Sequence, residues 1–335
     1  MTRLVLVAGT THTAGIEGIS AAGADPAAMA HTPSADAEIL EYGRPVRAPV
    51  VPVSPAGTPT PAVVTRAVRE ELDVPLTVVD GGLAKPTAAG TVTVGASLGE
   101  DIREPDPVPT ASGVFAAARQ FGRAIPEESV LVAETIPGGT TTALGVLTAL
   151  GEPASVSSSL PENPIERKRE VVTRGLDASD LSRGGAARDP ERALRRMGDP
   201  VLATAAGFAL GARESGTAVT LAGGTQMFAV AALLRHAGAR GALSLATTSF
   251  VADDPSASVN ELAAELGVEM TVTDPGFEEL DHPATEGYLA GEAKEGVGMG
   301  GALALADRAG VLPAVRERVA AATDQLLASA PEGRP

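Results

Sequence analysis

The segment Glu134-Thr-Ile-Pro-Gly-Gly-Thr-Thr-Thr joins a predicted strand at 130–133 to a predicted helix at 141–150. Paired glycines at a helix start, here Gly138 and Gly139, present free backbone N–H groups at the positive end of the helix dipole, where phosphate binds. The threonines that follow, among them Thr140 and Thr141, add hydroxyl donors. No Gly-Lys-Ser/Thr follows the glycines, so the segment is not a P-loop. It predicts a site for a phosphorylated small molecule.

Glu295 stands directly before a second glycine-rich segment, with Gly296, Gly298 and Gly301 in G-x-G-x-x-G spacing. A dinucleotide fingerprint also requires a preceding strand and a following βαβ unit, and only helix is predicted after Gly301, so NAD is not expected. The glycines instead predict a loop that lets a ligand approach the backbone. A carboxylate in a mostly apolar shell can act as a general base, because burial raises its pKa towards neutrality. A solvated loop residue is the alternative, and the spacing leaves both open.

Two further turns are predicted at the same sheet edge as the Glu134 segment. Gly223 and Gly224 join a strand to a helix, and Asp80 ends a strand before another glycine pair. Turns that follow parallel strands lie along one edge of the sheet, and several together support a ligand pocket better than one alone.

Lysine is rare in this sequence, which contains only Lys85, Lys168 and Lys294. From the residues alone, we interpret all three as ordinary surface residues. Lys168 lies in a helix predicted at 164–175, with Asn163 as its N-cap. It would reach a phosphate only if this helix packed beside the Gly-Gly turn. The sequence alone favours an exposed helix surface with Glu–Arg pairs.

The composition excludes several classes of protein. The 335 residues include 26 basic and 42 acidic ones, and the net charge of −16 argues against a nucleic-acid groove. The absence of cysteine excludes disulfides, thiolate metal sites and cysteine nucleophiles. The four histidines do not have metal-ligand spacing, and we predict no metal and no cofactor. An acidic, lysine-poor composition is typical of adaptation to high salt.

The sequence also indicates where the protein resides. The N-terminal residues 2–9 form a short predicted strand without the long apolar region of a signal peptide. No apolar run is long enough to span a membrane. We therefore expect a soluble, cytoplasmic protein with no membrane partner.

Short β-branched runs alternate with alanine-rich helical stretches. Strands are predicted at Leu4–Ala8, Val50–Val53, Leu76–Val79, Thr91–Val94, Val130–Ala133, Ala218–Leu221, Leu243–Ala246 and Glu269–Thr273. Helices are predicted at 61–71, 112–122, 141–150, 164–175, 190–197, 201–213, 226–236, 258–266, 301–309 and 314–328. The alternation predicts an α/β fold with a doubly wound parallel sheet. We expect one domain over 1–335, with a smaller helical part from about 10–60 and about 283–330, and a surface course for the proline-rich residues 31–62.

Four segments, in order, resemble the nicotinate-nucleotide–dimethylbenzimidazole phosphoribosyltransferases of cobalamin assembly, and especially their archaeal relatives. They are Val78-Val-Asp-Gly-Gly-Leu-Ala, Glu134-Thr-Ile-Pro-Gly-Gly-Thr-Thr, Ile165-Glu-Arg-Lys-Arg-Glu-Val-Val and Lys294-Glu-Gly-Val-Gly-Met-Gly-Gly-Ala-Leu-Ala-Leu. They are similar to the family's Val-Asp-x-Gly, Glu-Met-Gly-Ile-Gly-Asn-Thr-Thr, Ala-Arg-Lys-Arg and Gly-Glu-Gly-Thr-Gly-Ala-Ala-Leu-Ala-Leu. The resemblance extends from about residue 74 to about residue 312.

The resemblance implies that phosphoribose is transferred from nicotinate mononucleotide to a benzimidazole nitrogen, with release of nicotinate and inversion to the α linkage. It places the catalytic base at Glu295, the nucleotide-binding residues at Glu134, Gly138 and Gly139, and the lysine near the phosphate at Lys168. It also implies a homodimer that needs no metal or redox cofactor. Such a transfer passes through an oxocarbenium-like state, which positioning and a nearby carboxylate favour.

The sequence departs from the family mainly in the acceptor half of the site. The family's N-terminal Asp-His-Gly segment has no clear counterpart in residues 1–60, and its Gly-Gly-Phe-Glu-Ile segment is replaced by Gly198-Asp-Pro-Val-Leu. The acceptor therefore stays open between dimethylbenzimidazole, adenine and another azole. Two other functions also stay open: a catalytically silent protein that binds a nucleotide or corrinoid precursor, and a phosphoribosyl hydrolase that uses water as acceptor.

Overall fold

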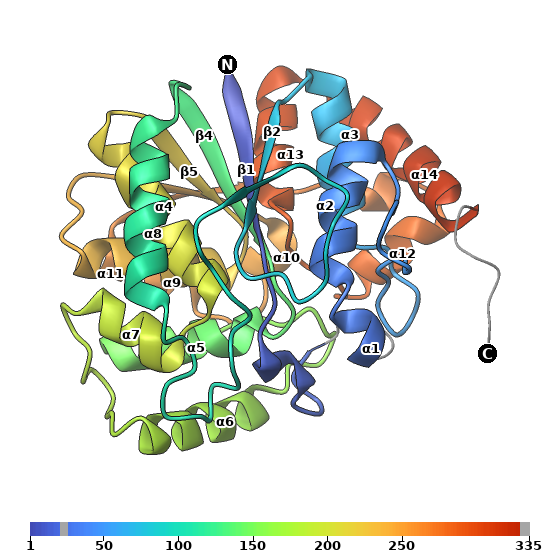
Figure 1. Ribbon diagram of the computed structural model, residues 1–335. Coiled ribbons are helices and arrows are strands. Elements are labelled where there is room, and N and C mark those ends of the chain that lie inside the picture. Colours follow the sequence, from blue (N-terminus) through green and yellow to red (C-terminus); the bar gives the residue numbers. More distant parts are fainter. Residues whose placement is uncertain (21–25, 329–335) are drawn as a thin grey trace.

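Seven parallel strands form the centre of the computed structural model, which describes residues 1–20 and 26–328 (Figure 1). They are β1 (Thr2–Ala8), β2 (Leu76–Asp80), β3 (Thr91–Thr93), β4 (Ser129–Thr135), β5 (Ala218–Ala222), β6 (Leu243–Thr248) and β7 (Val268–Thr273). Their spatial order is β3-β2-β1-β4-β5-β6-β7. The chain therefore builds outward from β1, returns to place β4 beside β1, and builds outward again on the other side. This confirms the predicted doubly wound sheet and creates a switch point between β1 and β4, where such folds bind ligands.

Alternate residues of the central strands face two different hydrophobic cores. In β1, Val5 belongs to one core and Leu4 to the other. In β4, Val132 and Leu131 are divided in the same way. Successive side chains of a strand point to opposite faces, so a strand buried on both faces appears in the sequence as an uninterrupted apolar run. Those runs are the signal that located the strands.

Helices cover both faces of the sheet. They are α1 (Pro26–Met29), α2 (Thr32–Tyr42), α3 (Ala62–Leu72), α4 (Ala111–Ala124), α5 (Gly139–Leu150), α6 (Ile165–Ala178), α7 (Pro190–Met197), α8 (Pro200–Glu214), α9 (Thr225–His236), α10 (Ser249–Ala252), α11 (Val259–Leu266), α12 (Pro283–Leu289), α13 (Met299–Ala309) and α14 (Leu312–Ala328), with short 3-10 helices η1 (His12–Gly15) and η2 (Phe277–Glu279). Helices α4, α5, α8 and α9 pack in the core that contains Val5, and α2, α3, α13 and α14 pack in the core that contains Leu4 (Figure 1). None of the described helices is long and apolar enough to cross a membrane.

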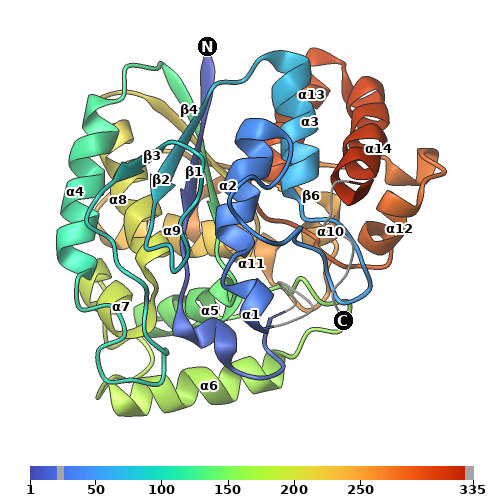
Figure 2. The ribbon, with the colours of Figure 1, turned by 45° about the vertical axis from the view of Figure 1, so that its right-hand side comes forward.

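The two ends of the chain build one helical layer together. Helix α3, from the first part of the chain, packs against α2, α13 and α14, and Figure 2 shows these helices side by side. Helix α13 also packs on β5, β6 and β7, so the layer rests directly on the sheet. Of the segments expected to form a smaller helical part, residues 21–25 and 329–330 lie outside the described residues.

The expected surface course of residues 31–62 is wrong for residues 32–42, which form the buried helix α2. Its apolar side chains, including Ile39 and Leu40, lie in the core. The carboxylate of Glu38 is also buried, where it accepts hydrogen bonds from the backbone amides of Arg47 and Ala48 at 2.9 and 3.0 Å. Tertiary contacts thus satisfy a polar residue that the sequence pattern assigns to the surface.

Seven of the eight predicted strands are present, and Val50–Val53 is the exception. Only Val53 makes a β-bridge, an isolated one with Pro59. The nearby Pro49, Pro52 and Pro55 have no amide hydrogen and cannot donate to a strand ladder. Residues 50–53 are therefore a loop despite their β-branched composition.

Candidate functional site

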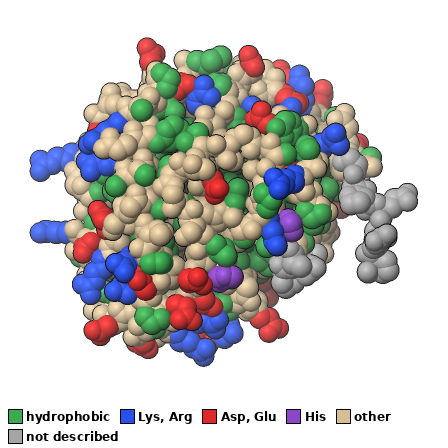
Figure 3. All heavy atoms as spheres, in the orientation of Figure 1, with side chains coloured by type: hydrophobic (Ala, Val, Ile, Leu, Met, Phe, Trp, Pro, Cys, Tyr) green, Lys and Arg blue, Asp and Glu red, His purple; other side chains and the backbone are tan. Residues whose placement is uncertain are grey.

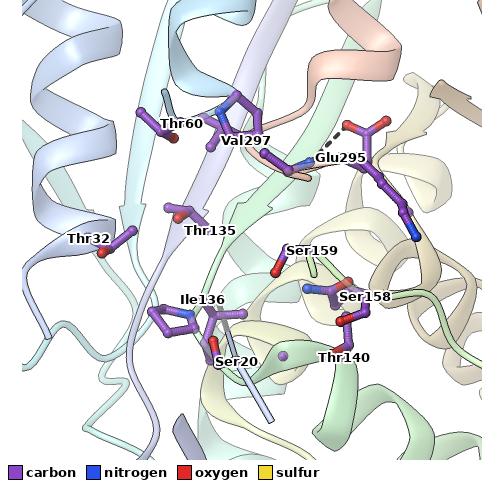
Figure 4. A pocket seen from close by; sticks show the side chains of 18 of the residues that line it. Ser20, Thr32, Thr60, Thr135, Ile136, Thr140, Ser158, Ser159, Glu295 and Val297 are labelled. Carbon is purple, nitrogen blue, oxygen red and sulfur yellow. Dashed lines mark hydrogen bonds between the residues drawn. The ribbon is translucent and has the colours of Figure 1, made fainter. Parts of the chain in front are cut away.

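A pocket of about 1000 Å³, including its open mouth, lies at the carboxyl end of β4 (Figure 4). Residues 134–140, 157–159, 224–226 and 293–297 line it, together with residues between 19 and 61. Strand β4 leads directly into the first of these segments and β5 into the third. The pocket therefore occupies the sheet edge that the glycine turns predict, and it joins segments from most of the chain.

The loop 134–140 brings Glu134, Gly138, Gly139 and Thr140 to the pocket. Gly138 precedes α5 with a φ of 79°, a left-handed conformation that glycine adopts without steric cost. A Cβ on Gly139 would lie only 2.7 Å from the Cγ2 of Ile136. Both glycines are thus required by the turn. The amino-terminal turn of α5 borders the pocket, as an anion site requires.

Glu295 lines the pocket and is held by the backbone that follows it. Its Oε1 accepts hydrogen bonds from the amides of Gly296 and Gly300 at 3.1 and 3.0 Å. A Cβ on Gly224 would be 3.5 Å from the Glu295 side chain, so the β5–α9 turn packs against this glutamate. Burial raises the pKa of Glu295 to about 7, against the opposing effect of the amide hydrogen bonds. Glu295 is thus half-buried and held by backbone amides, which differs from a freely solvated loop residue, and its role as a base stays a prediction.

Three further carboxyl groups are buried around Glu295. Burial, followed by the nearby charges of Asp199, Glu295 and Asp36, raises the pKa of Glu134 to about 8. Burial also raises the pKa values of Asp36 and Asp199 to about 6. Among the described residues, no group of His, Asp and Glu side chains has the arrangement of a metal site. Glu134, Asp36 and Glu295 line the pocket, whereas Asp199 lies outside its lining. The pocket therefore holds three carboxyl groups with pKa values near neutrality, and such groups are common in active sites.

Two of the three lysines are buried, so the surface interpretation is wrong for Lys168 and Lys294. Lys294 lines the pocket, and its ammonium lies 2.7 Å from a carboxylate oxygen of Asp254. Lys168 does not line the pocket; its Nζ donates to the carbonyl oxygen of Ser157 at 3.0 Å, from behind the pocket wall. Burial lowers the pKa of Lys168 to about 7. Lys168 thus supports the serine segment, residues 157–159, from outside and does not reach into the pocket.

Helix α6 packs beside α5, yet its outer surface carries the predicted Glu–Arg pairs. Arg169 pairs with Glu166 and Arg167 with Glu170, and Figure 3 shows both acidic and basic side chains at the lower edge of the molecule, where Figure 1 places this helix. The predicted N-cap is wrong: the Nδ2 of Asn163 donates to the carbonyl oxygen of Val156 and does not cap the helix.

Four other predicted site residues lie outside the pocket lining: Thr141, Asp80, Gly223 and Gly298. The Asp80 carboxylate accepts hydrogen bonds from the amides of Gly82 and Leu83, both at 2.9 Å, and so caps its own turn. Gly298 serves packing, because a Cβ there would lie 2.7 Å from the Cβ of Ala133 in β4. The glycines after Glu295 therefore divide their roles: Gly296 lines the pocket, whereas Gly298 allows α13 to approach the sheet.

The sequence interpretation missed several pocket residues. They are Ser157, Ser158 and Ser159, Thr225 and Gln226 at the start of α9, and Thr32, Asp36 and Thr60 from the first part of the chain. The run of three serines is visible in the sequence and could have been noticed. Asp36 carries no such signal, since it is a single acidic residue in a region that resembles a surface loop.

Comparisons with known proteins show which family and which fold the chain resembles. A family model described as phosphoribosyltransferase matches residues 116–249. A UPF0284 protein of Halobacterium salinarum is 58% identical over 97% of this chain and 98% of its own. A UPF0284 protein of Methanosarcina mazei is 41% identical over 91% of this chain and 89% of its own. The structure of the nicotinate-nucleotide–dimethylbenzimidazole phosphoribosyltransferase of Thermus thermophilus is similar, with a TM-score of 0.60 and 20% identity over 99% of this chain and 87% of that chain.

Proposed function

Because this chain belongs to the UPF0284 family, an archaeal branch of the phosphoribosyltransferases, we propose that it transfers phosphoribose from nicotinate mononucleotide to an azole base. The product is an α-ribosyl azole phosphate suited to the nucleotide loop of cobalamin. The observation that carries the proposal is one pocket with two kinds of site: a helix amino terminus for phosphate and a half-buried glutamate with a pKa near neutrality.

The phosphate half of the proposed site lies at the amino terminus of α5. Thr140, Ser158 and Ser159 lie together on one side of the pocket in Figure 4 and offer hydroxyl donors. Behind them, Lys294 and Lys168 share one buried acidic neighbour, Asp254. The pKa of Lys168 is lowered to about 7, so an anion in the pocket would favour its protonated form. The helix dipole also favours an anion here.

Glu295 is the proposed general base. One azole nitrogen attacks the anomeric carbon, and the bond from that carbon to the nicotinate nitrogen breaks with its electron pair left on nicotinate. The proton on the other azole nitrogen passes to the Glu295 carboxylate, and from there to solvent. A base with a pKa near 7 is suited to this step, because an appreciable fraction is ionised at neutral pH and still basic enough to take the proton.

The experiment that tests this function is incubation of the purified protein, in high salt, with nicotinate mononucleotide and dimethylbenzimidazole, followed by mass spectrometry. Ribosyl-azole phosphate together with free nicotinate is the expected result. Nicotinate released equally without azole would identify a hydrolase. Nucleotide binding without any nicotinate release would identify a binding protein.

A further inference from the structure

Two polar residues on one face of α2 line the pocket and are not used by the proposed transfer chemistry. Thr32 and Asp36, one helical turn apart, are only 7% and 2% exposed. The Thr32 hydroxyl has no hydrogen-bond partner in the described part of the chain. A buried hydroxyl without a partner carries a desolvation cost, which a ligand group that hydrogen-bonds to it would remove.

Asp36 is held in place but keeps capacity for a ligand. Its Oδ1 accepts a hydrogen bond from the Thr60 hydroxyl and its Oδ2 one from the Thr135 hydroxyl, both at 2.7 Å. A carboxylate has about four acceptor positions, so each oxygen can accept one more donor. Because Thr60 and Thr135 come from different parts of the fold, their two hydrogen bonds hold the Asp36 carboxyl group in one position.

The charge on the side of the pocket lined by Thr32 and Asp36 determines which part of the reactants can bind there. Phosphate and the nicotinate carboxylate are anions, and a buried acidic group disfavours them. In Figure 4, Thr32 and Thr60 lie across the pocket from Ser158 and Thr140. Ile19, Val53 and Pro61 add apolar surface nearby, which suits a flat ring. A neutral heteroaromatic base meets these conditions, and the nucleotide does not.

We propose that Thr32 and Asp36 select an acceptor azole whose six-membered ring carries a hydrogen-bond donor, such as a hydroxyl or an amino group. This inference rests on the proposed transfer reaction and specifies its acceptor. A ring that presents only methyl groups leaves the Thr32 hydroxyl without a partner and the remaining acceptor positions of Asp36 unused. A site built to hydrogen-bond a substrate rejects analogues that lack the donor more strongly than a purely apolar pocket discriminates by size.

The first test is competition between three acceptors at equal concentration with nicotinate mononucleotide. 5-Hydroxybenzimidazole carries the donor, 5-methylbenzimidazole is close to it in size without a polar group, and 5-methoxybenzimidazole keeps the oxygen without the donor. We expect product from the hydroxy compound to exceed each of the others by about tenfold or more. Equal use of the three, or preference for either donor-free ring, overturns the inference.

Variants then assign the preference to α2. Asp36→Asn and Thr32→Val should each reduce the preference for 5-hydroxybenzimidazole over 5-methylbenzimidazole by about tenfold. Ser34→Ala is the matched control, because its hydroxyl on the same helix bonds to the Lys85 carbonyl oxygen outside the pocket. An unchanged preference in both pocket variants, or a rise in the KM for nicotinate mononucleotide alone, would show that these residues do not select the acceptor.

A separate measurement distinguishes failure of this inference from failure of the proposed function. If none of the three azoles yields product, the transfer reaction is wrong for these acceptors. Calorimetric titration of the same protein with each azole then still decides the inference. Tighter binding of the hydroxy compound supports it, and equal binding of all three overturns it.

Discussion

The backbone amide of Val297 donates a hydrogen bond to the carbonyl oxygen of Glu134 across 2.9 Å. This bond joins the end of β4 to the loop before α13, two segments that lie far apart in the sequence. It holds the two pocket glutamates near each other, and the charge of Glu295 contributes to the raised pKa of Glu134. The loop at residues 134–140 and the loop that carries Glu295, the proposed base, are therefore held together by a direct hydrogen bond.

Replacing Glu295 by glutamine should abolish most turnover and leave nucleotide binding intact. Glutamine keeps the shape of the side chain but cannot accept the azole proton, so we expect kcat to fall by about 10²- to 10⁴-fold. Steady-state kinetics and calorimetric titration with nicotinate mononucleotide measure the two effects. Full activity of Glu295→Gln would remove this residue from the mechanism.

The rate should rise with pH as Glu295 ionises. The carboxylate is the active form of a base, and its pKa is raised to about 7, so kcat should increase from about pH 5.5 and level off above about pH 8. A kcat–pH profile at saturating substrates checks this. A profile for wild type that is flat, or one whose rise persists unchanged in the residual activity of Glu295→Gln, would mean that another group controls the rate.

The stability of the ligand-free protein should change with pH in the opposite direction. The pKa of Glu134 is raised to about 8 in the folded state, so the folded protein holds this proton more tightly than the unfolded chain does. The resulting contribution to the free energy of unfolding is fully present below the pKa of the unfolded chain and is lost as pH rises through about 8. Glu134→Gln cannot ionise. Between about pH 5 and about pH 7, the free energy of unfolding of wild type should fall relative to that variant by up to about 1.4 kcal/mol per pH unit. Urea denaturation of both proteins at each pH measures the difference. The same pH dependence of the unfolding free energy in wild type and in the variant would contradict the raised pKa.

The buried pair of Lys294 and Asp254 should contribute far more to stability than an exposed pair. Burial opposes ionisation of Asp254, yet hydrogen bonds from Lys294 and two serines lower its pKa to about 2. Lys294→Met removes the ammonium that pairs directly with this carboxylate and leaves only Lys168 as a nearby cation, and we expect a loss of about 3–5 kcal/mol in unfolding free energy.

Arg169→Met provides the matched control, since its pair with Glu166 is exposed and should contribute less than about 1 kcal/mol. The double variant Lys294→Met/Asp254→Asn should recover part of the loss, because it removes the unpaired charge. Chemical denaturation of wild type, the two single variants and the double variant measures these losses. Similar losses for Lys294→Met and Arg169→Met would argue against a buried charge pair.

Two helical glycines should respond oppositely to alanine. A Cβ on Gly301 would lie 2.4 Å from the Cβ of Ala222, so Gly301→Ala should separate α13 from β5 and cost about 1–3 kcal/mol. Gly113 in α4 is exposed and has nothing within 4 Å of a Cβ, so Gly113→Ala should stabilise the protein by up to about 1 kcal/mol. Thermal and urea unfolding measure both. Equal effects would contradict the close packing of α13.

Most elements of the fold, apart from α2 and the loop at residues 50–53, could be predicted from local patterns in the sequence, as could the two glycine-rich segments that line the pocket. Strands buried on both faces leave continuous apolar runs, and a glycine pair between strand and helix has a local steric cause, as at Gly138 and Gly139. Local patterns of this kind also identified Glu134 and Glu295 as candidate site residues. Family resemblance assigned their roles.

Which of the other polar residues reach the pocket depends on how distant segments pack together, and local sequence patterns do not reveal it. Asp36 enters it because α2 is buried against the sheet, and Lys294 enters it while Lys168 stays behind the serine segment. Asp80, at a similar strand end, caps its own turn instead. Such placements depend on contacts between segments far apart in the chain, and burial and hydrogen bonding there override what composition indicates locally.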